Sequence, residues 1–293
     1  MNELRIDNII NWLPEFIKNK NSSISGKINL SSTKWIEPVG ISIIKSIELS
    51  TPDIEIIKPA SKNVKNYLDI MQSDCSSQGQ TFMSIKIINT RQQSNIDKIA
   101  NEIAEKMLKN IDFKDDMEYK KDYQDYLKYM LSEVMLNAVS HSDSTVDIVA
   151  CAQYYPYKRK TQVSIVDCGV GFKATLSRKH NDIFNERDAL KKAIQKGITG
   201  SIQYVYQNAI KNIGIGLYAL SQMVKKLNGY LSIVSKDGCL ILENNQIRTT
   251  ELPCKWDGSI VAFEFDLNVI NLDFIDFMKL YVYQEENSEE DIF

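Results

Sequence analysis

Residues 131–143 read LSEVMLNAVSHSD and carry polar side chains at a regular spacing. Glu133, Asn137 and His141 recur at intervals of four, and each step of four turns only about 40° around a helix. The three side chains therefore form one stripe. A separate apolar face is formed by Met130, Leu131, Val134, Met135 and Ala138. The pattern predicts an amphipathic helix whose polar stripe either serves a ligand or simply meets solvent.

A carboxylate stands at the end of a predicted strand further along the chain. The apolar run 163–166 leads directly into Asp167, and Gly169 and Gly171 follow at alternate positions. Glycine allows a ligand to approach the backbone closely, although DxGxG also describes an ordinary turn.

Two more glycine motifs follow. Gly214 and Gly216 precede Leu217 at the start of a predicted helix, where free N–H groups and the helix dipole favour phosphate oxygens. Gly258-Ser259 begins the last long strand. Glycines at such positions also serve packing alone.

The periodicity around these motifs predicts two α/β units. After a helix over 123–142, strands are expected over 145–155, 161–172, 230–242 and 258–267, with a helix from Gly214 to Asn228-Gly229 between them. Helices on one side of a mostly antiparallel sheet make an α/β sandwich. Strand candidates near 27–36 and 81–89 and a helix over 95–111 indicate a smaller α/β unit before it. We expect domains at 1–118 and 119–270 and an acidic tail at 271–293. The charged segment 112–124 is either the boundary or the first turns of the next helix.

Composition narrows the function classes. The net charge of −3 offers no electrostatic reason to expect nucleic acid as the main partner. The cysteines show no CxxC spacing and are odd in number, which favours reduced thiols in a cytoplasmic protein. No signal peptide or apolar run long enough to span a bilayer, about 18 residues, is found.

Taken in order, ExxxNAxxH, DxGxG, GxGL and the glycine-hydroxyl pair resemble the nucleotide-binding motifs of the GHKL superfamily, which includes gyrase, heat-shock chaperones, histidine kinases and mismatch-repair ATPases. The resemblance covers about residues 123–268. The helix around Glu133 and His141 looks closest to the anti-sigma-factor serine kinases. The fold implied is the Bergerat α/β sandwich, and the ligands implied are ATP and Mg²⁺.

The resemblance implies a role for each matching residue. Asp167 accepts the adenine amino hydrogen, Gly169 and Gly171 let the backbone reach the base, and Ser259 joins the water network beside Asp167. Asn137 binds Mg²⁺, and Glu133 is the general base. The phosphates are held at the helix start by Gly214, Gly216 and the Leu217 amide.

Two further assignments have alternatives. His141 lies near the nucleotide in the resembling branch, but a packed residue at a helix end fits equally. The interval 172–213 occupies the position of an ATP lid, in which Thr199 of the GITG sequence and Lys191, Lys192, Lys196 and Lys211 are candidate phosphate contacts. The other reading is an ordered helical insert unrelated to ATP.

Two functions from different classes remain. The first is an ATP-dependent serine/threonine kinase of the anti-sigma type in bacterial regulation, acting on a protein partner. The second is a nucleotide-gated ATPase or interaction switch, regulatory or defensive, that does not phosphorylate protein. A homodimer is expected in either case. A self-contained sensor kinase is disfavoured because the only other histidine, His180, lies inside the predicted lid.

The N-terminal sequence INLSSTKWIEPVGISIIKSI resembles the strand, turn and helix entry of STAS-type anti-sigma antagonist domains. The phosphorylatable hydroxyl of such domains then falls near Ser31, Ser32 or Thr33. The alternative is an unrelated α/β module whose isoleucines form its core.

Overall fold

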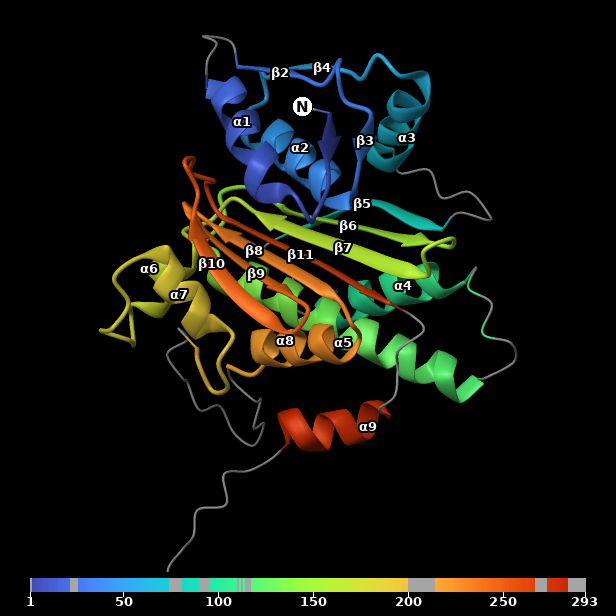
Figure 1. Cartoon of the computed structure of the whole chain (residues 1–293), viewed down its shortest axis with the longest axis vertical. Helices are drawn as coiled ribbons and strands as arrows, with labels where there is room; N and C mark the ends of the chain where they lie inside the picture. The colour runs from blue at the N-terminus through green and yellow to red at the C-terminus, as the bar shows by residue number, and fades with distance from the viewer. Residues whose placement is uncertain are drawn as a thin grey trace, which may run out of the picture.

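A computed structural model of the chain describes residues 2–21, 26–73, 81–89, 95–109, 111, 113, 117–199, 214–266 and 273–283. It is a mixed α/β structure built on one large antiparallel sheet with helices on both faces (Figure 1). Within these ranges no helix has the length and apolar character needed to cross a bilayer.

The central sheet has seven strands in the order β10-β9-β8-β11-β7-β6-β5, and every neighbouring pair is antiparallel. Their bounds are β5 (Phe82–Ile88), β6 (Ile148–Tyr155), β7 (Lys160–Asp167), β8 (Tyr230–Ser235), β9 (Gly238–Glu243), β10 (Gln246–Glu251) and β11 (Ser259–Asp266). The mostly antiparallel sheet predicted from the sequence is confirmed. The edge strand β10 was not predicted, because its side chains are mostly exposed and give no apolar signal.

Short turns join the neighbouring strands on the β8–β9–β10 side. Asn244 and Asn245 connect β9 to β10 and both have positive φ, at 49° and 62°. Asparagine tolerates this left-handed conformation, which a two-residue hairpin of matching twist requires. Lys236 also has a positive φ, 50°, in the turn from β8 to β9.

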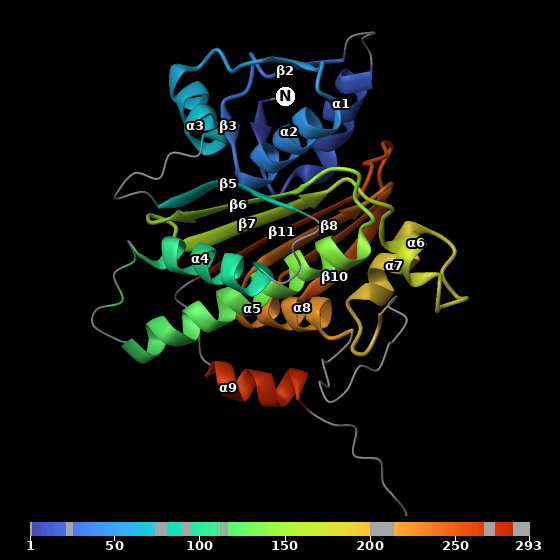
Figure 2. The same cartoon turned by 180° about the vertical axis from the view of Figure 1, so that it is seen from behind.

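One face of the sheet is covered by three helices, α4 (Ile96–Leu108), α5 (Met117–His141) and α8 (Gly216–Lys226) (Figure 2). Alternate side chains of β11 lie on opposite faces of the sheet. Val261, Phe263 and Phe265 join the helical core, whereas Ile260 and Ala262 join the core on the other face. The predicted helices over 95–111, 123–142 and 214–229 are therefore present. Helix α5 begins at Met117, so residues 117–122 form its first turns, as one of the two alternatives for the charged segment 112–124 predicted.

The opposite face is covered by the N-terminal unit. It comprises β1 (Glu3–Leu4), α1 (Ile9–Asn21), β2 (Lys27–Asn29), β3 (Trp35–Ile36), α2 (Pro38–Ser50), β4 (Glu55–Ile57) and α3 (Lys62–Gln72). Helix α2 packs directly on β6, β7 and β11. It is apolar around most of its surface, as expected of a helix enclosed by protein. It begins at Pro38, whose fixed φ suits a first helical position.

The large sheet contains strands from both sides of residue 118, where the sequence predicted a domain boundary. Strand β5 pairs with β6, and α4 packs on α5, so both belong to the layers of the later unit. Helix α9 (Phe274–Phe277) and the short π-helix η3 (Met278–Val282) lie within the predicted tail. Their aromatic side chains pack on α5, with Phe277 against Tyr126 at 5.5 Å between ring centroids. The acidic residues 284–293 lie outside the described ranges.

Candidate functional site

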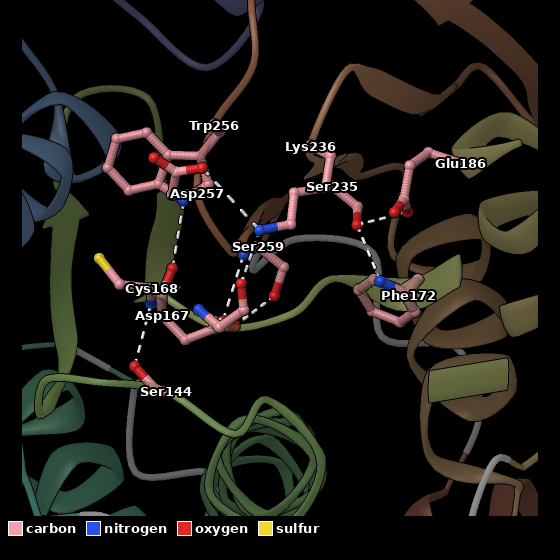
Figure 3. Close-up of polar contacts among 11 residues, drawn as sticks. Ser144, Asp167, Cys168, Phe172, Glu186, Ser235, Lys236, Trp256, Asp257 and Ser259 are labelled. Atoms are coloured by element: carbon pink, nitrogen blue, oxygen red, sulfur yellow. Dashed lines mark hydrogen bonds and ion pairs between the residues drawn. The ribbon is translucent and has the colours of Figure 1, made fainter. Parts of the chain in front are cut away.

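Asp167 ends β7 and lies opposite Ser259 in the antiparallel pair of β7 and β11. The side chain is only 3% exposed. Its Oδ1 accepts hydrogen bonds from the backbone N–H of Gly169 at 2.9 Å and of Ser259 at 3.2 Å. The Ser259 hydroxyl donates to Oδ2 (Figure 3). Burial raises the pKa of Asp167 to about 6, and these hydrogen bonds limit the rise.

The backbone around Asp167 is held by side chains from other elements. Trp256 donates its indole N–H to the Asp167 carbonyl at 3.1 Å. The Ser144 hydroxyl accepts from the Cys168 N–H at 3.1 Å (Figure 3). The Cys168 Sγ in turn lies 3.1 Å from the Ser46 Oγ of α2. Contacts from other elements, one of them in the N-terminal unit, therefore hold the chain at Asp167 and Cys168.

Residues 169–172, which we call the glycine loop, pack on the C-terminal end of α5. The Val170 N–H donates to the Ser142 carbonyl at 2.7 Å. A Cβ added to Gly169 would lie 2.0 Å from the same carbonyl oxygen. Only glycine permits this approach, so the DxGxG motif and the helix of the ExxxN motif meet here.

Gly169→Ala should therefore destabilise the fold strongly. We expect a loss of about 3 kcal/mol or more in the free energy of unfolding, because the added methyl group meets backbone that cannot rotate away. Urea denaturation measures this loss. Gly197→Ala is the matched control, since a Cβ there meets nothing within 4 Å. The control should lose only the cost of a positive φ, about 1–2 kcal/mol. Equal losses in the two variants would contradict the predicted clash.

Glu133 of α5 meets the glycine that opens α8. A Cβ on Gly216 would lie 2.1 Å from the Glu133 Oε2. The carboxylate therefore stands directly over the start of a helix, and the first and third sequence motifs are in contact. Leu217 is buried, so its side chain serves the core while its backbone N–H belongs to the first turn of α8.

The residues before α8 fold back on the segment that contains Thr199. Gly214 has a φ of 84°, and its carbonyl accepts from the Gly197 N–H at 3.1 Å. A Cβ on Gly214 would lie 2.7 Å from the Ile198 carbonyl oxygen. Thr199 follows Ile198 directly and is half-buried, so the chain brings this candidate to the glycine motif.

Asn137 lies on α5 between Glu133, which contacts Gly216, and the helix end, where Ser142 contacts Gly169. It is half-buried, one turn after Glu133 and five residues before Ser142. At 1.5 Å of rise per residue these positions are about 6 Å and about 7.5 Å away along the helix axis. His141 ends α5, and its side chain lies outside the described part of the structure.

The segment predicted as a lid is helical where it is described. Helix α6 (Phe172–Leu176) and α7 (Glu186–Ala193) pack together, and α7 packs on β9. Lys192 pairs with Asp182. Lys191 and Lys196 are exposed. Gly200 and Lys211 lie outside the described residues. The described part, up to residue 199, thus contains two packed helices, which both a lid and an insert unrelated to ATP allow.

Three residues outside the sequence motifs also hold the glycine loop. Lys236 donates to the Gly169 carbonyl at 2.8 Å. The Ser235 Oγ accepts from the Phe172 N–H at 2.9 Å and donates to Glu186 at 2.7 Å. The only local signal is the polar pair Ser235-Lys236 at the end of an apolar strand, which also describes a solvent-exposed turn.

The hydroxyls considered in the STAS-like sequence lie between β2 and β3 of the N-terminal unit. Ser31 and Ser32 are exposed, whereas Thr33 is buried. Only the two serines offer an accessible side chain there.

Within the described ranges, no group of three or more His, Cys, Asp or Glu side chains is placed to hold a metal ion. A metal at this site would have to complete its coordination with oxygen atoms from a ligand or water.

Comparison with protein-family models, curated proteins and solved structures finds no match. The chain is a mixed α/β protein in which a large antiparallel sheet carries a buried aspartate among glycine turns.

Proposed function

We propose that this chain binds Mg²⁺-ATP and acts as a serine/threonine protein kinase of the type its motifs resemble. The observation that carries the proposal is the contact between motifs that are distant in sequence. Gly216 meets Glu133, Gly169 meets Ser142 at the end of the same helix, and Asp167 bonds Ser259.

Asp167 and its loop form the adenine end of the proposed site. A buried, ionised carboxylate held by neighbouring N–H and O–H groups is a fixed acceptor for an amino hydrogen. Gly169 and Gly171 let the loop pack tightly on Ser142 and Ser235, which fixes its backbone beside Asp167. A carboxylate accepts a hydrogen bond from the amino group of adenine. It cannot do so from the carbonyl that guanine carries at the same ring position, so this end selects adenine over guanine.

The start of α8 forms the phosphate end. The backbone N–H groups of its first turn and the positive φ of Gly214 suit phosphate oxygens. Asn137 lies between the two ends and would give Mg²⁺ one amide oxygen, with the phosphates completing the shell. The metal would neutralise phosphate charge.

Glu133 is the proposed general base. It is half-buried and adjoins the helix start at Gly216, where the phosphates would lie. A carboxylate at this place can take the proton from a serine or threonine hydroxyl as it attacks.

A nucleotide-gated switch without protein phosphorylation is the second candidate, and the packing of the N-terminal unit favours it. Ser46 of α2 contacts Cys168, the residue directly after Asp167. A cavity of about 320 Å³ also lies between α1, α2 and the loop before β11, with Lys20, Cys168 and Trp256 in its wall. Nucleotide bound at Asp167 could change the packing of this unit against a partner.

Incubation with Mg²⁺ and γ-labelled ATP separates the two functions. Label appearing on protein supports the kinase, and its acceptor can be mapped, with Ser31 and Ser32 as the accessible candidates in the N-terminal unit. Label released as phosphate supports the switch. Asp53→Asn, which changes an exposed aspartate, is the matched control for loss of signal by Asp167→Asn. Absence of nucleotide binding by the unaltered chain would contradict both functions.

A further inference from the structure

Glu186 at the start of α7 and Ser235 at the end of β8 form a buried pair that we name the 186–235 clasp. Glu186 is 7% exposed and Ser235 is fully buried. The Glu186 Oε2 accepts from the Ser235 hydroxyl at 2.7 Å and from the Lys173 N–H at 3.1 Å. The Ser235 Oγ accepts from the Phe172 N–H at 2.9 Å (Figure 3). One chain of hydrogen bonds thus leads from the backbone of the glycine loop to a buried carboxylate.

The clasp also encloses Gly171. This glycine has a φ of 85°, and a Cβ on it would lie 2.8 Å from the Ser235 Oγ and 3.1 Å from the Glu186 Oε1. Gly238 makes room for the first turn of α7 at Glu186, since a Cβ there would lie 2.7 Å from the Glu186 Cβ. The loop is therefore pressed against the clasp at Gly171 and bonded to it at the next two residues.

The direction of the hydrogen bonds depends on Glu186. The Ser235 hydroxyl has one hydrogen, and the carboxylate takes it, so a lone pair of Oγ faces the Phe172 N–H. Without an acceptor at residue 186 the hydroxyl can rotate. The partly buried N–H of Lys173 then also loses its partner, which is unfavourable.

We propose that the 186–235 clasp positions the backbone of residues 169–172 for the adenine base. This inference rests on the proposed nucleotide site and adds two positioning residues to it. Neither side chain needs to touch the nucleotide, because each acts through the loop that follows Asp167. Lys236, next in the chain to Ser235, supports the same loop from the Gly169 carbonyl.

Calorimetric titration of the whole chain with adenosine, ADP and ATP in Mg²⁺ tests the clasp. Glu186→Ala should lower the affinity for all three ligands by the same factor, about 10- to 100-fold, because the loop contacts the base and not the phosphates. The stoichiometry should stay unchanged. Glu186→Gln should restore binding, because its amide oxygen can accept from both Ser235 and Lys173. Glu251→Ala is the matched control. It removes an exposed carboxylate of β10 that pairs with Arg187, the neighbour of Glu186 on α7, and this variant should bind all three ligands normally.

Ser235→Ala provides a second route to the same test. It should weaken adenosine binding, and the double variant should be no weaker than the worse single variant, because the two residues act as one unit. Unchanged affinity in both single variants would overturn the clasp. So would a fall in stoichiometry at constant affinity, which indicates partial unfolding alone. Failure of the unaltered chain to bind any of the three ligands would instead overturn the proposed function, and the clasp with it.

Discussion

Glu133→Gln is expected to slow ATP turnover by about 100- to 10,000-fold and to leave ATP affinity nearly unchanged. Glutamine has the size of glutamate, so the packing against Gly216 is kept while the proton acceptor is lost. The effect should fall on kcat rather than on binding, since the carboxylate acts only as the nucleophile loses its proton. Label transfer or phosphate release under saturating ATP gives kcat, and titration calorimetry gives affinity.

Glu118→Gln is the matched control for this prediction. Glu118 lies on the same helix, α5, and is exposed in its first turn, so its variant should turn over ATP at the normal rate. Turnover by Glu133→Gln at the rate of the control would exclude Glu133 as the base. Loss of ATP binding along with turnover would mean that Glu133 shapes the start of α8 rather than the chemical step.

Asp167→Asn should lower the affinity for adenine nucleotides by about 10- to 100-fold. The same variant should raise the free energy of unfolding of the ligand-free protein above pH 6. The amide presents a donor where the adenine amino group needs an acceptor. It can still accept from the Gly169 and Ser259 N–H groups and donate to the Ser259 hydroxyl, so the fold is kept. The variant therefore separates a binding role from a structural one.

The sign of the stability change follows from the pKa of Asp167. Burial raises this pKa from 3.8 to about 6, so between those values the folded chain keeps a proton that the unfolded chain has lost. Stability therefore falls as pH rises through about 6, by up to about 3 kcal/mol. Asparagine carries no charge and avoids this loss. In urea denaturation the variant should exceed the unaltered chain at pH 8, and the difference should shrink toward pH 4.5.

Asp53→Asn is the control here as well, and it should show no such pH-dependent gain because Asp53 is exposed. Stability of Asp167→Asn below that of the unaltered chain at pH 8 would mean that the ionised carboxylate holds the loop together. Unchanged nucleotide affinity would contradict the assignment of Asp167 to the adenine end.

Local signals account for the elements that were predicted well. Helix α8 begins at a glycine pair and is followed by Asn228, whose φ of 46° ends it, so both ends are marked in the sequence. The first turns of α5, residues 117–122, were not part of the predicted helix because they are mostly charged and carry little apolar periodicity.

The sequence alone predicted helices α4, α5 and α8, the antiparallel character of the sheet and the positions of Glu133, Asn137 and Asp167 on their elements. Periodicity and capping act over a few residues, so they can be recognised without knowing what an element packs against. The tertiary structure was needed to show that β5 joins the large sheet, that Gly169 and Gly216 must be glycine, and that Glu186 meets Ser235. These features depend on atoms that are far apart in the chain, and burial of both sheet faces brings them together.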